Sequence, residues 1–312
     1  MANSEVFGIE QEVAKPGARG SMARLASVLA DMGSLTKPRI TSLVLLTGAA
    51  GVGLARRTAG LRTLTLALIG TALIVGAANA LNMWLERDLD ARMERTRHRP
   101  LPAGRLSPDV ALAFGIALAS LAIPMLFLVN VSTGCLGVAA LLIYVALYTP
   151  LKRRTDLALL VGAVPGAIPP LLGWTAATGA LGAGGLLLFS LLFFWQLPHF
   201  AAISIARADD YARANLKVIS TVRSARSARR IVWIWSALLV ASSLSFVPCG
   251  FAGIRYLIAA IALAIPCLGL AFQGLSTSPR FDASRWATRV FAFSIPHLTL
   301  LLIALLCDHS VP

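Results

Sequence analysis

Long apolar segments separated by short polar ones make up most of this 312-residue chain. Each apolar segment approaches the roughly 20 residues that a helix needs to cross the hydrocarbon core of a bilayer. The pattern predicts an all-α integral membrane protein with about nine transmembrane helices. The nine segments lie at 40–55, 64–85, 110–129, 135–149, 157–174, 181–198, 231–249, 256–273 and 290–307.

Residues 1–36 form the long polar stretch ahead of the first apolar segment. This stretch contains acidic residues and has no apolar run followed by a small-residue cleavage site, so it does not resemble a signal peptide or a transit peptide. We expect a cytosolic N-terminal tail over residues 1–36, with a surface helix near residues 22–32. The transmembrane domain is expected over residues 37–308.

The composition agrees with a membrane protein and excludes several other classes. Hydrophobic residues make up 57% of the chain and charged residues only 13%, with a mean hydropathy of +0.76. A water-soluble domain carries roughly 25% charged residues, and a disordered chain is far less apolar. The four cysteines stand singly in the sequence, which indicates neither a disulfide framework nor a cysteine metal site.

The net charge of +14 is distributed unevenly along the chain. With the N-terminus inside, 24 of the 28 basic residues fall on the inner side. Because inner loops carry the excess of Lys and Arg in membrane proteins, this distribution predicts a cytosolic N-terminus. A basic rim that sets topology also removes the reason to expect a nucleic-acid partner. The basic residues left on the outer side are Arg56, Arg57, Arg62 and Arg255.

The richest polar segment lies at the inner end of the second apolar stretch. Asn82, Glu86 and Asp90 are spaced four residues apart, so on a continuing helix they share one face. Two carboxylates and an amide oxygen on one stripe suit a hard cation such as Mg²⁺. The alternative is a helix leaving the lipid with solvated ion pairs, for instance Asp88 with Arg92. Asn82 favours the first interpretation because it precedes the charged run and should lie near membrane depth.

A basic triplet follows the fourth apolar segment, where Tyr148 precedes Lys152, Arg153 and Arg154. Such a triplet at an inner helix end commonly anchors topology or contacts lipid headgroups. The functional alternative is that one or two of these cations hold a diphosphate whose metal ion lies on the Asn82 stripe.

A third polar group follows the sixth apolar segment. Asp209 and Asp210 could complete a second metal site or could be ordinary loop charges. His199, next to Pro198 at a membrane boundary, could be a base, a porphyrin contact or a packed aromatic ring. The sequence contains no phosphate loop, no dinucleotide fingerprint and no zinc-binding HExxH helix.

These motifs resemble the UbiA superfamily of intramembrane prenyltransferases, and within it the protohaem IX farnesyltransferase (haem O synthase) branch. The superfamily pattern N-x-x-x-D-x-x-x-D is similar to Asn82, Glu86 and Asp90. The branch-specific segments resemble residues 93–108, 148–155, 162–174, 195–200, Asp210-Tyr211 and Ser294-Ile295. The resemblance runs from about residue 35 to residue 308.

The resemblance implies a UbiA-type fold, in which nine helices surround a central cavity that opens toward the cytosol. It implies Mg²⁺-dependent transfer of the farnesyl group of farnesyl diphosphate to a vinyl group of protohaem IX, giving haem O for respiratory oxidases. It further implies a multi-pass protein of the bacterial inner membrane with its active site toward the cytoplasm. Membrane lipid and haem A synthase are the other partners that it suggests.

The resemblance also implies roles for individual residues. The catalytic group comprises Asn82, Glu86, Asp90 and Lys152. The metal ligands comprise Asn82, Glu86, Asp90, Asp209 and Asp210. The substrate-binding group comprises Arg95, Arg99, Tyr148, Lys152, Arg153, His199 and Tyr211.

The chain departs from the family pattern at several positions. Glu86 stands where the family has Asp, the segment after Asp210-Tyr211 lacks both expected prolines, and His297 replaces an aromatic residue. These departures leave two alternatives open. One is a UbiA-type prenyltransferase that acts on a quinone-type aromatic acceptor, and the other is a non-catalytic membrane transporter or haem-handling protein.

Overall fold

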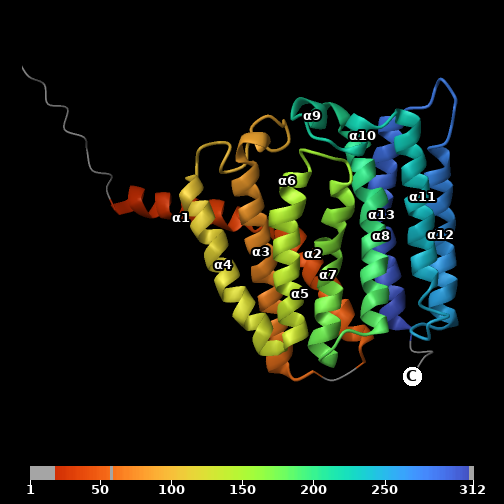
Figure 1. Ribbon diagram of the computed structural model, residues 1–312, viewed down its shortest axis with the longest axis horizontal. Coiled ribbons are helices and arrows are strands. Elements are labelled where there is room, and N and C mark those ends of the chain that lie inside the picture. Colours follow the sequence, from red (N-terminus) through yellow and green to blue (C-terminus); the bar gives the residue numbers. More distant parts are fainter. Residues whose placement is uncertain (1–17, 57–58, 309–312) are drawn as a thin grey trace, which may run out of the picture.

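Long helices run side by side along one axis and form a single bundle (Figure 1). This computed structural model describes residues 18–56 and 59–308, so residues 1–17 of the expected tail lie outside the described part. The described residues are helices and connecting loops without a strand. The elements are α1 Ala18–Leu35, α2 Pro38–Leu54, α3 Leu61–Asp90, α4 Pro108–Val129, α5 Val131–Leu142, the π-helical turn η1 Ile143–Tyr148, α6 Thr149–Leu151, α7 Ala158–Thr178, α8 Ala183–Ala206, α9 Ala208–Arg213, α10 Ile219–Val222, α11 Ala225–Leu244, α12 Ile254–Gln273 and α13 Ala283–Cys307.

Seven of these helical segments are long and apolar enough to cross a membrane, which confirms the all-α membrane fold. They are α3, α4, the continuous segment Val131–Leu151, α7, α8, α12 and α13. Of the other two expected spans, α2 has only 17 residues, and α11 begins with the polar run Ala-Arg-Ser-Ala-Arg-Arg. Both pack within the bundle, α2 against α7 and α11 against α8. The count of nine and the side of the N-terminus stay predictions.

Several helices begin at side chains that accept a hydrogen bond from the first turn. Ser107 Oγ accepts from the Val110 N–H at the start of α4, and Asn130 Oδ1 accepts from the Thr133 N–H at the start of α5. These bonds satisfy N–H groups that have no partner inside the helix. They fix where the chain leaves a loop and enters the bundle.

Glycines bring α2 and α7 together at backbone distance. A Cβ atom at Gly51 would overlap the Pro170 carbonyl, and one at Gly173 would overlap the Gly48 carbonyl. Small residues allow this close approach, which replaces the hydrophobic driving force that helices lack inside lipid. The α2–α7 pair therefore forms a tightly closed wall of the bundle.

Three connecting segments, one of which contains the short helices α9 and α10, lie at one end of the bundle (Figure 1). We call residues 91–107, 152–157 and 207–224 the cap loops. Hydrogen bonds join them: the Lys217 N–H donates to the Lys152 carbonyl at 3.1 Å, and Arg223 Nε lies 2.7 Å from Asp156 Oδ2. Helix α1, which includes the expected surface helix, runs across the bundle rather than along it.

The fourth predicted span is one helix with an irregular turn. The π-helical turn η1 widens the segment Val131–Leu151 by one residue relative to an α-helix. One added residue rotates everything beyond it by about 100°. The turn thereby sets the direction in which Tyr148 and Lys152 leave the helix.

Candidate active site

A cavity of about 620 Å³ lies inside the bundle, with its polar end beneath the cap loops. Helices α2, α3, α7 and α8 and the turn η1 supply most of its wall. The polar side chains at the capped end include Lys37, Asn82, Glu86, Asp90, Arg95, Arg99, Tyr144, Tyr148, Lys152 and Tyr211. Most of the deeper residues are apolar, among them Val44, Ile74, Leu141, Pro165, Pro169 and Leu192. The cavity thus joins a charged rim to an apolar chamber.

The acidic stripe of α3 points into this cavity. Asn82, Glu86 and Asp90 are only 3%, 4% and 4% exposed, as expected for residues on one inward helix face. Asp88, between them, has a 78% exposed side chain and lies 4.0 Å from Arg87. The solvated ion-pair interpretation therefore applies to Asp88 and not to the stripe.

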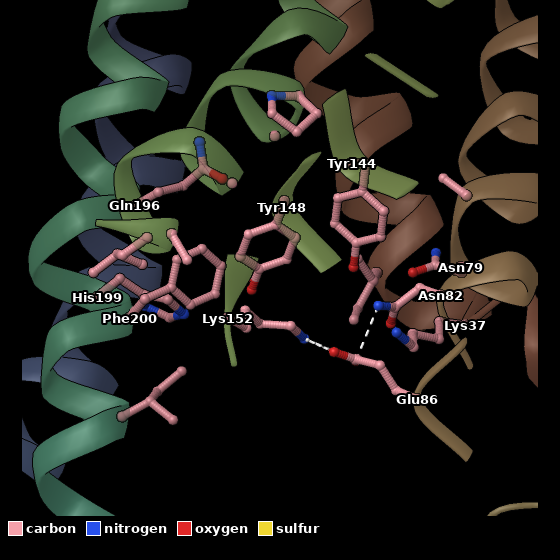
Figure 2. A pocket seen from close by; sticks show the side chains of 18 of the residues that line it. Lys37, Asn79, Asn82, Glu86, Tyr144, Tyr148, Lys152, Gln196, His199 and Phe200 are labelled. Atoms are coloured by element: carbon pink, nitrogen blue, oxygen red, sulfur yellow. Dashed lines mark hydrogen bonds and ion pairs between the residues drawn. The ribbon is translucent and has the colours of Figure 1, made fainter. Parts of the chain in front are cut away.

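Glu86 is held by Asn82 on its own helix α3 and by Lys152 in the cap loop 152–157 (Figure 2). Its Oε2 accepts hydrogen bonds from Asn82 Nδ2 at 2.9 Å and from Lys152 Nζ at 2.8 Å. The ammonium of Lys152 also lies 2.6 Å from Oε1. Asn82 Nδ2 has a second contact, 3.0 Å from Thr149 Oγ1, which ties α3 to the end of the π-helical turn.

Asp90 has a matching partner in the loop that follows α3. Arg99 Nη1 donates to Asp90 Oδ2 at 2.7 Å, and Thr96 Oγ1 donates to the Asp90 backbone carbonyl at 2.9 Å. The loop therefore folds back over the helix end that carries the stripe. Each buried carboxylate of the stripe is paired with one cation at the rim.

The donor set of the stripe fits Mg²⁺. Two carboxylates and the Asn82 amide oxygen are hard oxygen ligands on one buried helix face. In the described part of the chain, no group of three His, Cys, Asp or Glu side chains could hold a metal ion by itself. This agrees with Mg²⁺ rather than opposing it, because Mg²⁺ usually takes one or two carboxylates, waters and substrate phosphate oxygens.

Two tyrosines stand above the stripe on successive turns of the irregular helix (Figure 2). The ring centroids of Tyr144 and Tyr148 are 5.3 Å apart, and the Lys152 ammonium lies 4.9 Å from the Tyr148 centroid. An aromatic face attracts a cation at this distance. The tyrosine faces therefore offer stabilisation for positive charge next to the charged rim.

Lys37 is a cavity residue that the sequence motifs did not single out. It precedes the first residue of α2 and adopts a left-handed backbone conformation with φ of 50°, which turns its side chain toward Asn82 and Glu86 (Figure 2). Burial, together with the cations of Arg99 and Lys152, lowers the pKa of Lys37 from 10.5 to about 7. The site thus holds a third basic group beside the cations of its two ion pairs.

The second acidic element is placed differently from the stripe. Asp209 is exposed, whereas Asp210 is 6% exposed and accepts hydrogen bonds from the Glu94 N–H at 2.9 Å and from Arg213 at 2.8 Å. Burial alone would raise the pKa of Asp210, but these two donors hold it below its ordinary value. In this structure Asp210 joins two cap loops and does not line the cavity.

Of the other residues predicted to contact substrate, some line the cavity and one does not. Arg95, Tyr211 and His199 line the cavity, His199 from its apolar side. Arg153 is exposed outside the lining and lies 3.5 Å from the Leu85 carbonyl. This position suits its alternative interpretation as a surface anchor.

Gln196 holds the wall of the apolar chamber. Its Nε2 donates to the Ala163 carbonyl at 3.1 Å and to the Leu192 carbonyl at 3.0 Å. Gly166 makes room for it, because a Cβ atom there would overlap Gln196 Oε1. Gln196 thereby joins α8 to α7 in the wall of the cavity.

Sequence signals existed for the residues that the motif analysis missed. Tyr144 lies four positions before Tyr148, the same spacing that identified the stripe. Lys37 is the basic residue at the start of the first apolar segment, followed directly by a proline. Neither signal indicates by itself that the side chain reaches the stripe.

Comparison with known proteins identifies the family of the chain. Residues 44–295 match the UbiA prenyltransferase family. A protoheme IX farnesyltransferase from Anaeromyxobacter sp. (strain Fw109-5) is 51% identical over 276 residues, which cover 88% of this chain and 92% of that relative.

Solved structures share the fold. A structure of digeranylgeranylglyceryl phosphate synthase has a TM-score of 0.77 at 15% identity, covering 90% of this chain and 98% of that one. A UbiA homologue from Archaeoglobus fulgidus, solved with GPP and Mg²⁺, has a TM-score of 0.59 at 15% identity, covering 88% and 99%. The sequence match over most of the chain and the shared helical fold lead to one conclusion: the chain belongs to the UbiA prenyltransferase family.

Proposed function

We propose that this protein transfers the farnesyl group of farnesyl diphosphate to a vinyl group of protohaem IX, with addition of water, to give haem O. The observation that carries the proposal is the cavity, in which a rim of paired carboxylates and cations opens into an apolar chamber. Both substrates combine an apolar body with anionic groups. The relatives named protoheme IX farnesyltransferase, which include the Anaeromyxobacter protein, support the same substrates.

The rim residues are suited to hold the diphosphate. Asn82, Glu86 and Asp90 would hold Mg²⁺, which supplies positive charge to the departing diphosphate. Lys152 and Arg99 already lie against these carboxylates, so either cation can reach phosphate oxygens bound at the same place. Charge placed where negative charge develops stabilises the transition state.

Further rim groups belong to the same proposal. Arg95 and Tyr211 line the cavity from two of the cap loops, where they would contact the diphosphate. Arg153 would add positive charge from outside the lining. For Asp209 and Asp210 we propose a second acidic element. Asp210 Oδ1, which accepts from the Glu94 N–H and from Arg213, would have to release these donors before it could bind a metal ion.

Breaking the allylic C–O bond puts positive charge on the farnesyl carbons and leaves the electron pair on the diphosphate. Tyr148 and Tyr144 present aromatic faces next to that bond's expected position at the rim. The apolar chamber excludes water that would capture the cation early. The vinyl group of the porphyrin then supplies the electron pair for the new C–C bond, and water adds to the resulting cation with loss of one proton.

The charge distribution supports a location for this chemistry. Most basic residues lie on the side of the cap loops, which the positive-inside rule assigns to the cytoplasm. We therefore propose a bacterial inner-membrane protein whose cavity opens toward the cytoplasm. Haem A synthase, which would use the product, is the proposed protein partner.

Expression in a strain that lacks its own haem O synthase tests the proposal. Haem extraction and chromatography should show haem O when the wild-type chain is expressed and none with an empty vector. Absence of haem O from membranes that contain the protein, farnesyl diphosphate, Mg²⁺ and haem would overturn it. Supplying an aromatic quinone precursor in the same assay tests the alternative acceptor.

Asp90→Asn separates an enzyme from a transporter or haem-handling protein. We expect haem O formation to fall by about 100-fold or more, since a ligand to the diphosphate-bound metal is lost. Asp88→Asn is the matched control, because Asp88 is two residues away with a 78% exposed side chain. Full function of Asp90→Asn would contradict the enzyme proposal.

A further inference from the structure

His199 on α8 has a single possible tautomer in this structure. Its Nδ1 lies 2.6 Å from Ser294 Oγ on α13. The Ser294 hydroxyl donates its own proton to the Phe291 carbonyl at 2.7 Å. Because a hydroxyl has only one proton to donate, Ser294 Oγ must accept from His199. Nδ1 therefore carries a proton, and in the neutral ring the lone pair lies on Nε2.

The plane of the imidazole ring is also fixed. Trp195 stacks on it with a centroid distance of 4.7 Å and an interplanar angle of 24°, and Phe291 packs against it at 4.9 Å. Trp195 is itself held by a 2.7 Å hydrogen bond from Nε1 to the Ser294 carbonyl. The ring consequently presents Nε2 in one direction.

The His199 ring lies at the wall of the cavity. His199 is part of the cavity lining, and within the described residues Nε2 has no hydrogen-bond partner. Of the three histidines in the described part of the chain, His98 is exposed on a loop and both ring nitrogens of His297 are enclosed in the protein. His199 lies across the cavity from Glu86, with Lys152 and Tyr148 between them (Figure 2).

A neutral imidazole in this arrangement resembles a metal-binding histidine. Histidines that bind a metal through one nitrogen donate a hydrogen bond from the other, which fixes the tautomer and the ring orientation. Histidine is also the proximal ligand of haem iron in many haem proteins. The proposed acceptor brings an iron ion into a cavity that otherwise offers an unpaired lone pair on its apolar side.

We infer that His199 Nε2 ligates the iron of protohaem and so holds the acceptor porphyrin against α8, opposite the acidic stripe of α3. This inference rests on the proposed function, because it requires haem as the acceptor. The bond is dative and reversible: the imidazole lone pair enters the iron coordination shell, and no oxidation or reduction accompanies it. Release of the product requires only its dissociation.

Binding of ferric protohaem to the purified full-length protein tests the inference without farnesyl diphosphate or Mg²⁺. Absorption and electron paramagnetic resonance spectra should show imidazole-ligated haem with the wild type. His199→Ala should lose that signature and bind haem about 10-fold or more weakly. Added free imidazole should restore the ligated spectrum of His199→Ala. His98→Ala is the matched control and should behave as the wild type.

Two further variants keep the test decisive. His199→Phe retains an aromatic ring between Trp195 and Phe291 without a ligating nitrogen, so it should lose the signature even if His199→Ala does not fold. Ser294→Ala removes the acceptor for Nδ1 and should weaken haem binding while leaving farnesyl diphosphate binding unchanged. Wild-type spectra and affinity in both His199 variants would overturn the inference.

The inference and the proposed function fail in different ways. If cells expressing the wild type make haem O but the His199 variants keep the wild-type haem spectrum, ligation is wrong and the proposed function stands. If the wild type shows ligation that depends on His199 but makes no haem O, the proposed function is wrong and the ligation stands.

Discussion

Lys152 and Glu86 form an ion pair across the mouth of the cavity, with the ammonium 2.6 Å from Oε1 and 2.8 Å from Oε2. Glu86 lies on α3 and Lys152 in the cap loop 152–157, 66 positions apart in the sequence. Their side chains are 20% and 6% exposed, so the pair is largely shielded from water. Lys152 thus neutralises a carboxylate that would otherwise be buried with an uncompensated charge.

Lys152→Met should therefore damage both stability and catalysis. Removing one partner of a buried ion pair costs about 3–5 kcal/mol, since the other charge stays desolvated. Loss of a cation at the leaving group should also lower haem O formation by about 100-fold or more. Thermal unfolding in detergent and haem chromatography measure the two effects separately.

The double variant Lys152→Met/Glu86→Gln distinguishes those effects. It removes both charges, so the unfolding temperature should return toward the wild-type value while haem O formation stays low. An unfolding temperature as low as that of Lys152→Met would show that the ion pair is not the source of the instability.

Asp210 is expected to act through the cap loops. Asp210→Ala removes the acceptor for the Glu94 N–H and should loosen the loop that carries Arg95 and Arg99, whereas Asp210→Asn retains an oxygen that can accept this bond. We expect haem O formation to fall more in the Ala variant than in the Asn variant. Equal loss in both variants would favour the metal-ligand role instead, and Asp209→Asn, at an exposed position, serves as the control.

Gly166→Ala should disturb the wall of the chamber. The new Cβ atom would overlap Gln196 Oε1, which forces the amide away from the carbonyls of Ala163 and Leu192. Two lost hydrogen bonds at about 1 kcal/mol each predict a free energy of unfolding lower by about 2 kcal/mol. At Gly269, an added Cβ meets nothing within 4 Å, so Gly269→Ala should be neutral or slightly stabilising.

His297→Phe should stabilise the protein. His297 is 1% exposed, and neither ring nitrogen has a hydrogen-bond partner within the described residues. An unsatisfied buried polar group costs about 1–3 kcal/mol, which an aromatic ring of similar shape avoids. The measurement is the unfolding temperature, and a decrease would mean that the imidazole has a partner whose loss is costly.

The acidic stripe could be predicted from the sequence because its geometry is local. Residues spaced four apart on one helix share a face whatever the rest of the chain does, so Asn82, Glu86 and Asp90 were identified together. The membrane fold was predictable for the same reason, since each span is a property of its own segment.

Pairings between distant segments were not predictable in this way. Lys37 reaches the stripe because its backbone is left-handed, a conformation that the sequence Lys-Pro-Arg does not specify. Asp210 is directed toward Glu94 by the folding of two loops, which no local pattern describes. Two of the nine predicted spans, α2 and α11, are not among the seven helical segments long and apolar enough to cross a membrane, because α2 is short and α11 begins with several arginines.

The π-helical turn makes chain length between Asn130 and Lys152 a determinant of chemistry. Deleting Val145 or Ala146 would convert the segment to a regular α-helix that is still long and apolar enough to span the bilayer. The same deletion would swing the Lys152 ammonium about 100° around the helix axis and away from Glu86. Activity at this site therefore depends on the number of residues in the segment. A variant that retains every polar side chain would still lose activity if one residue were missing.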